Sequence, residues 1–97
     1  MAYIRYSLVR PLPHHSEEVK SLLLRLSAWT VKQDGCIESF VLQPHDDSGE
    51  IARIAIYRDE HTAEHLASTN DVMAMRSQLD QIIDPTSHTE RAFFTIE

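Results

Sequence analysis

The hydrophobic positions of the chain change their spacing along its length, and each change predicts a new element. Ala2–Arg10 alternates with a period of two, which is typical of a half-buried β-strand. Ile4, Tyr6 and Leu8 fall on one face of this strand, and the opposite face also carries apolar residues. Pro11 cannot donate to a strand ladder, so the strand is expected to end there.

From Ser16 to Gln33 the apolar spacing changes to three and four residues, which predicts an amphipathic helix. Ser16 is the expected N-cap, and Glu17 and Glu18 follow at the positive end of the helix dipole. Gly35 follows the predicted helix at the position where a residue in the left-handed backbone conformation often ends a helix. The predicted buried face consists of Val19, Leu22, Leu23, Leu26, Trp29 and Thr30.

Two further strands are predicted over Cys36–Gln43 and Glu50–Arg58, because both carry β-branched and aromatic residues. The turn-forming residues of Pro44–Gly49 join them into a hairpin. Phe40 and Leu42 share one face of the first of these strands. In the second, Ile51, Arg53, Ala55 and Tyr57 alternate with Ala52, Ile54 and Ile56.

The last third of the chain predicts two helices and a strand. A short helix is expected over Asp59–Ser68 with its first residue as N-cap, and a longer one begins after a cap at Asn70 or Asp71 and runs to Ile83. Arg91–Ile96 is expected to be the fourth strand. The order β-α-β-β-α-β is the split βαβ arrangement of ferredoxin-like α+β folds with an antiparallel sheet.

The predicted sheet has apolar residues on both faces, whereas the helices of one chain can cover only one face. A second copy packed sheet to sheet would cover the other face, so a homodimer is expected. The 97 residues suffice for one domain, residues 1–97, and a chain of this size gains from the burial that a partner adds.

Composition narrows the classes of function. The net charge of −6, from 9 basic and 15 acidic residues, argues against nucleic-acid binding, which needs a basic surface. No apolar run reaches the roughly 18 residues of a membrane span, and the amino-terminal segment lacks a signal-peptide pattern, so we expect a cytoplasmic protein. The one cysteine, Cys36, excludes an intrachain disulfide. It is interpreted as a small buried hydrophobe, because Asp34 and Glu38 disfavour a thiolate.

Several short motifs occur in an order that resembles the antibiotic biosynthesis monooxygenase family. They are Pro11, Gly35-Cys36, Tyr57 at a strand end, Asp59-Glu60, and His65-Leu66-Ala67-Ser68. The resemblance spans nearly the whole chain, although the usual aromatic residue in the Tyr57 position is tryptophan. It implies a dimeric α+β barrel that oxidises phenolic or quinol-like compounds without a cofactor.

Haem-degrading enzymes on a similar dimeric barrel place an asparagine on the first strand, and a tryptophan and an iron-binding histidine in the second helical region. In this chain Ser7 falls near the asparagine, His65 or Leu66 near the tryptophan, and Met75 or Arg76 near the histidine. Because this set is broken, haem degradation is the least favoured activity, and no cofactor or metal ligand is predicted.

His65 is the candidate catalytic residue. A neutral imidazole could take a proton from a phenol or hydroquinone, and the resulting anion could react with oxygen. The alternative is a histidine at a helix edge, bound to a main-chain carbonyl or to a dimer partner. His61 stands four residues earlier on the same helical face, a spacing that can hold a metal, but no third ligand has a defined place.

The candidate substrate-binding residues are Trp29, Tyr57, Arg53 and Phe40. The two residues Trp29 and Tyr57 could form aromatic walls of a pocket between helix and sheet, with core packing as the alternative. Phe40, like Phe93 and Phe94, is interpreted more strongly as core.

Arg53 and Arg5 both lie in the middle of a predicted strand. Such an arginine either orients an anionic substrate or pairs with an acid such as Glu38. A structural ion pair is the favoured interpretation for both.

The sequence therefore predicts a cofactor-independent monooxygenase that acts on a small aromatic or quinol compound. The alternative is a non-catalytic dimeric module that binds a small hydrophobic metabolite. Both need an apolar pocket between helix and sheet, and they differ in whether a polar group converges on its centre.

Overall fold

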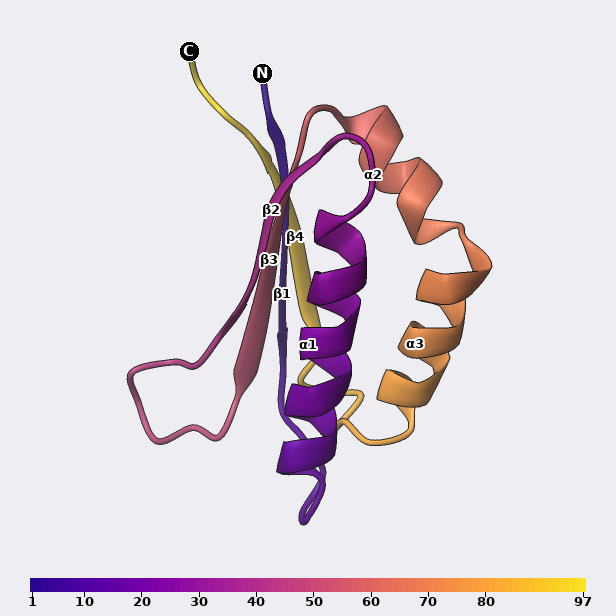
Figure 1. Ribbon diagram of the computed structural model, residues 1–97. Helices are drawn as coiled ribbons and strands as arrows, with labels where there is room; N and C mark the ends of the chain where they lie inside the picture. Colours follow the sequence, from indigo (N-terminus) through magenta and orange to yellow (C-terminus); the bar gives the residue numbers. More distant parts are fainter.

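The computed structural model describes residues 1–97 and contains four strands and three helices (Figure 1). In chain order these are β1 (Tyr3–Val9), α1 (Ser16–Val31), β2 (Cys36–Leu42), β3 (Ile51–Tyr57), α2 (Glu60–Ala67), α3 (Asn70–Asp80) and β4 (Thr89–Phe94). Every predicted element is present, and the order confirms the α+β ferredoxin-like fold. None of the helices combines the length and the apolar character needed to cross a membrane.

The strands form one antiparallel sheet in the order β2-β3-β1-β4, so β1 and β3 are its central strands. Ser7 on β1 lies opposite Arg53 on β3 and opposite Glu90 on β4, which places these three residues on one face. Tyr6 lies opposite Ile54 and takes the other face. The register confirms the faces predicted from the alternation of β1 and β3.

All three helices lie on one face of the sheet (Figure 1). Two hydrophobic clusters fill the space between the layers. The first consists of Val9, Val19, Leu22, Leu23, Ile51, Leu79 and Ile83. The second consists of Tyr3, Ala55, Tyr57, Ala63 and Leu66, with Trp29 and Cys36 packed against it. Each fully buried leucine or isoleucine contributes about 1.5–3 kcal/mol, so these clusters hold the helices on the sheet.

The opposite face of the sheet carries no helix and is strongly apolar. The register assigns to it Ile4, Tyr6, Leu8, Phe40, Leu42, Ala52, Ile54, Ile56 and Phe93. Phe40 and Phe93 are 44% and 40% exposed, and Phe94 at the sheet edge is 53% exposed, so the interpretation of all three as core residues is wrong for a single copy. Contiguous apolar patches usually mark interaction surfaces, and we call this patch the open face.

The ends of the elements differ from the prediction by a few residues. Ser16 is the first residue of α1 rather than its cap, since His15 takes the cap position without a side-chain cap hydrogen bond. Thr69, not Asn70 or Asp71, caps α3, because its Oγ1 accepts a hydrogen bond from a main-chain amide in the first turn at 3.4 Å. β4 begins and ends two residues earlier than predicted, because its pairing with β1 fixes its register.

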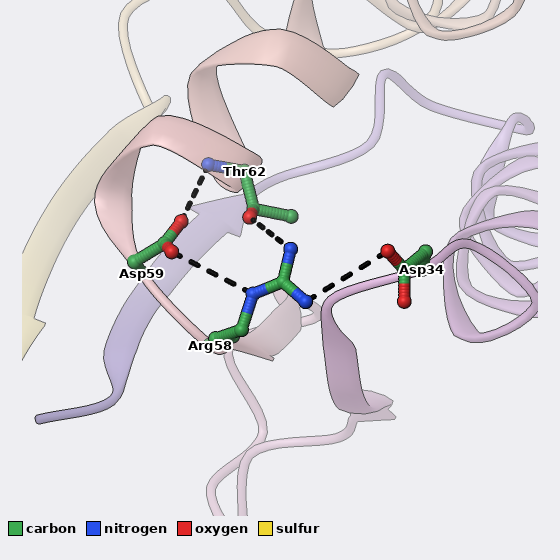
Figure 2. A network of polar contacts seen from close by, with 4 residues as sticks. All are labelled: Asp34, Arg58, Asp59 and Thr62. Atoms are coloured by element: carbon green, nitrogen blue, oxygen red, sulfur yellow. Dashed lines mark hydrogen bonds and ion pairs between the residues drawn. The ribbon is translucent and has the colours of Figure 1, made fainter.

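Arg58, which follows β3, joins the segment after α1 to the start of α2 (Figure 2). Its guanidinium lies 3.7 Å from the Asp34 carboxylate and 3.6 Å from the Asp59 carboxylate, and it donates to Thr62 Oγ1 at 3.4 Å. Asp59 accepts a hydrogen bond from the Thr62 amide at 2.8 Å, which confirms it as the N-cap of α2. Gly35 has a φ of +87°, and a Cβ there would lie 2.6 Å from Thr62 Cγ2. The close approach of the two segments therefore requires glycine at this position.

Candidate functional site

A cavity of about 270 Å³ lies between the sheet and helices α1 and α3. Its apolar walls are Tyr3 of β1, Leu23 and Leu26 of α1, and Leu79 of α3. Its polar side chains are Arg5, Ser7, Arg53, Arg76, His88 and Glu90. Tyr6, Arg91 and Ala92 border it as well, but the register turns Tyr6 and Arg91 toward the open face. Apolar walls with a few converging polar groups are typical of small-molecule sites.

Arg53 is the predicted site residue that the structure places in this cavity. It donates from Nη2 to Thr30 Oγ1 at 2.9 Å and from Nε to Ser27 Oγ at 3.3 Å, and both acceptors belong to α1. None of the ion pairs of the chain includes Arg53. The favoured pairing with Glu38 is wrong, because the register places Glu38 opposite Ile56, on the open face.

Arg5 lies on the same face of β1, two residues before the residue that is opposite Arg53. The two arginines are therefore diagonal neighbours on adjacent strands. The guanidinium carbon of Arg5 lies 5.7 Å from the centroid of the Tyr3 ring, within the range of a cation–π contact. Arg5 also takes part in none of the ion pairs, so two guanidinium groups border the cavity without a carboxylate partner.

A carboxylate–histidine cluster of Arg76, Glu90 and His88 forms another part of the lining. Arg76 on α3 donates from Nη2 to Glu90 Oε1 at 2.8 Å, and His88 Nε2 lies 3.2 Å from the same oxygen. The side chain of His88, directly before β4, is 24% exposed. A carboxylate that holds one ring nitrogen of a histidine leaves the other nitrogen free to exchange a proton with a ligand.

His65 lies elsewhere. It is exposed on α2 and does not line the cavity. α2 turns Thr62, Ala63 and Leu66 inward, which leaves His65 on its outer side. Its main-chain carbonyl accepts a hydrogen bond from Ser68 Oγ at 2.8 Å. The role of His65 as a base stays a prediction, and the surroundings of its side chain in one copy of the chain give it no support.

Trp29 and Tyr57 come together, but in the second hydrophobic cluster rather than at the cavity. Tyr57 is 5% exposed and packs with Tyr3 and Leu66, and Trp29 is half-buried against them. Core packing, the alternative left open by the sequence, describes these surroundings. Phe40 lies on the open face, on the other side of the sheet from the cavity.

The carboxylate–histidine cluster was not predicted from the sequence, in which His88 falls between the predicted helix that ends at Ile83 and the predicted strand that begins at Arg91. Glu90 fell just before the predicted start of the fourth strand at Arg91, so its side chain had no assigned face. The available signal was the alternation of β4 extended back by two residues. That extension places Glu90 opposite Ser7, on the face covered by helices.

The surroundings of the cysteine and of the possible metal ligands can be described directly from the structure. Burial raises the pKa of the Cys36 thiol above its ordinary value, and the nearby Arg53 charge opposes this only in part. No group of three or more His, Cys, Asp or Glu side chains is placed to hold a metal ion. Of the two residues near the region where haem-degrading enzymes have their histidine, Arg76 carries no lone pair for iron, and Met75 packs against the first hydrophobic cluster.

A wider surface groove of about 530 Å³ runs between α1 and α3. Its lining is Glu17, Glu18, Ser21, Leu22, Arg25, Gln78, Gln81 and Ile82. Only two of these eight residues are hydrophobic, and no cluster of ion pairs forms there. We therefore treat the groove as the gap between two neighbouring helices and take the smaller cavity as the candidate site.

Fold and cavity together define a small α+β ferredoxin-like protein with a ligand-sized space between its sheet and its helices. No protein-family model matches the sequence, and no curated protein matches it either. Solved structures do match. The chain is similar to Rv0793 from Mycobacterium tuberculosis, with a TM-score of 0.90 at 15% identity over 100% of this chain and 97% of that one.

Two further similar structures carry the name of an activity. One is a variant of SnoaB, a cofactor-independent oxygenase from Streptomyces nogalater, with a TM-score of 0.86 at 14% identity over 99% of this chain and 94% of that one. The other is a candidate antibiotic biosynthesis monooxygenase from Deinococcus radiodurans, with a TM-score of 0.86 at 15% identity over 100% and 94% of the two chains. The chain therefore has an antibiotic-biosynthesis-monooxygenase-like fold, which confirms the predicted resemblance at the level of the fold.

Proposed function

We propose that this protein is a small cofactor-independent monooxygenase that oxidises a phenolic or quinol-type compound in the cavity between β1, β4, α1 and α3. The observation that carries the proposal is His88, held by Glu90 at the wall of a cavity that also has apolar walls and two unpaired guanidinium groups. The similarity to a cofactor-independent oxygenase of the same fold supports the choice of reaction class.

The first step is removal of a proton from the substrate. A neutral His88 that donates its Nε2–H to Glu90 keeps Nδ1 free to accept the hydroxyl proton of a phenol. The Glu90 carboxylate then lies beside the imidazolium that forms, and the opposite charges attract. This assigns the base to His88 in place of His65.

The later steps need only the substrate and molecular oxygen. The phenolate passes one electron to oxygen, and the two resulting radicals join as a peroxide on the ring carbon opposite the hydroxyl. When that carbon carries hydrogen, the peroxide takes back the proton held by His88 and loses water to leave a carbonyl, so one phenol and one oxygen molecule give one quinone and one water. Arg5 and Arg53 border the cavity where the negative charge develops, and guanidinium groups stabilise such charge.

Oxygen uptake by the purified protein tests this function. We expect uptake with at least one member of a panel of naphthols and hydroquinones, unchanged by a metal chelator. With a member of the panel that carries hydrogen on the ring carbon opposite its hydroxyl, adding catalase should return no oxygen, because the reduced product is water rather than hydrogen peroxide. No uptake across the panel, with ligand binding retained, would favour the alternative of a non-catalytic binding module.

The proposal includes a homodimer formed through the open face. The three central apolar residues Ile4, Ile54 and Ile56 stand there without cover from any helix of the same chain. A second sheet packed against them would remove this surface from water, which the hydrophobic effect favours by about 25 cal/mol per Å². The residues of the cavity lie on the other face, so dimerisation leaves the site open.

A further inference from the structure

The charged side chains that face the cavity are mainly positive, whereas the protein as a whole is negatively charged. The chain has a net charge of −6, yet the side chains that face the cavity include three arginines and one acid. The acid is Glu90, and its Oε1 receives both Arg76 and His88. No carboxylate of the protein therefore remains for Arg5 or Arg53.

The position of Arg53 is fixed before any ligand arrives. Its Nε and Nη2 donate to hydroxyl groups of Ser27 and Thr30 on α1. Thr30 Oγ1 donates its own proton to the Leu26 carbonyl at 2.7 Å, which orients its lone pairs toward the guanidinium. A guanidinium has five N–H donors, so three remain free for a ligand.

Arg5 supplies a second guanidinium beside the first. Diagonal neighbours on adjacent strands have Cα atoms roughly 7–8 Å apart, which lets two long side chains converge on one group. Two like charges this close repel each other, and a half-buried guanidinium without a counter-charge loses favourable hydration. An anion bound between them would offset both costs.

We infer that the ligand of this cavity is an aromatic acid whose carboxylate binds between Arg5 and Arg53, with its ring against Tyr3 and the leucines of α1. The inference deepens the proposed function, because it names the substrate class of the same site. A cavity of about 270 Å³ admits a one- or two-ring compound. A hydroxyl on the same ring would then point toward the carboxylate–histidine cluster on the opposite side of the space.

Binding without turnover tests the inference. The probes are 5-hydroxy-1-naphthoate and 1-naphthol, which share the ring and the hydroxyl and differ in the carboxylate, and in the acid the two groups lie on opposite sides of the ring system. Titration by calorimetry under anaerobic conditions measures both affinities, so the result does not depend on oxygen chemistry. We expect the acid to bind at least about tenfold more tightly than the neutral phenol, the scale of a charge-assisted pair.

The variants Arg5→Gln and Arg53→Gln should each lower the affinity for the acid about tenfold and leave that for 1-naphthol unchanged. Arg58→Gln is the matched control, because Arg58 is 58% exposed and lies outside the cavity. Arg53 also binds two hydroxyls of α1, so its removal loosens the fold. The side chain of Arg5 makes no hydrogen bond or ion pair, so if Arg53→Gln does not fold, Arg5→Gln alone decides.

Equal affinity of the wild type for the two probes would overturn the inference, as would an unchanged preference for the acid in Arg5→Gln. Either outcome leaves the proposed monooxygenase standing with a neutral substrate. Conversely, a carboxylate preference in a protein that consumes no oxygen would support the aromatic-acid site and contradict the reaction. The two failures are therefore distinguishable.

Discussion

A single carboxylate oxygen, Glu90 Oε1, receives both the guanidinium of Arg76 and the ring nitrogen of His88. At the scale of residues, the assignment of the base depends on this contact. His65, the residue that the sequence favoured, is exposed on α2 and borders no part of the cavity. His88 has both a carboxylate partner and a place in the lining.

The variants His88→Ala and His65→Ala separate the two assignments. With a quinol that supports oxygen uptake, His88→Ala should lower kcat by about 10²–10⁴-fold, the usual contribution of a general base. His65→Ala should retain the wild-type rate, because its side chain does not line the cavity. Steady-state rates on an oxygen electrode measure both, and the reverse result would restore the assignment made from the sequence.

Adding a single methyl group at Gly35 should disturb the fold. Gly35→Ala combines a φ of +87° with a Cβ that would lie 2.6 Å from Thr62 Cγ2. Gly49→Ala is a matched control, because Gly49 has a φ of +77° and no atom near its virtual Cβ. We expect Gly35→Ala to cost about 1–3 kcal/mol of unfolding free energy more than Gly49→Ala.

Urea denaturation followed by circular dichroism measures the unfolding free energy of both glycine variants. The backbone strain is common to the two replacements, so their difference reports the crowding against α2. An equal loss in both would show that α2 moves away without cost.

At the scale of elements, the type of each helix and strand follows from the sequence, because the periods of two and 3.6 residues are distinct. The ends follow less well, since they depend on partners distant in the chain. The start of β4 is set by its pairing with β1. The N-cap of α3 is Thr69 rather than either predicted residue, Asn70 or Asp71. The carboxylate–histidine cluster could not be predicted for the same reason. Its residues Arg76, His88 and Glu90 come from α3, the following connection and β4, and they meet only in the folded protein.

Because Asp59 caps α2, the unfolding free energy of the protein should depend on pH in the acidic range. Hydrogen bonds from the side chain and the amide of Thr62 lower the pKa of Asp59 below its ordinary value. The folded protein therefore releases this proton more readily than the unfolded chain. The contribution of Asp59 is present above the unfolded pKa of about 3.9 and is lost as the pH falls through the lower folded pKa.

Asp59→Asn keeps a side-chain acceptor for the Thr62 amide and removes the titration. We expect the urea midpoint of this variant to fall less than that of the wild type between pH 5 and more acidic conditions. Asp46 and Asp84 have lowered pKa values from similar local hydrogen bonds, so both proteins will still lose some stability. Parallel curves for the two proteins would contradict the assigned role of Asp59.

At the scale of the whole molecule, the two faces of the sheet differ in what covers them. One face holds the helices, the hydrophobic clusters and the cavity, and the open face holds the apolar residues that one copy leaves uncovered. The sequence predicted this division correctly, because the two faces of β1 and β3 alternate in the chain. It could not locate the cavity, whose volume depends on how α1 and α3 pack.

Light scattering after size exclusion should give a mass of twice the 11.2-kDa protomer at micromolar concentration. Ile54→Glu places a charge in the middle of the open face and should give a monomer with a lower melting temperature. Met73→Glu is the matched control, because Met73 is an exposed residue of α3, away from the open face. A wild-type monomer, or a dimer that survives Ile54→Glu, would exclude the open face as the interface.

The central position of β1 also determines where the gene can tolerate insertions and deletions. Arg5 faces the cavity, while its neighbours Ile4 and Tyr6 face the other side of the sheet. Losing one codon from β1 would exchange the faces of the remaining residues of the strand, which would turn a guanidinium toward the open face and an isoleucine or leucine toward the cavity. Losing one codon from the loop 44–49 would shorten a connection and exchange no face. Length variation among descendants of this gene should therefore collect in that loop and be absent from β1.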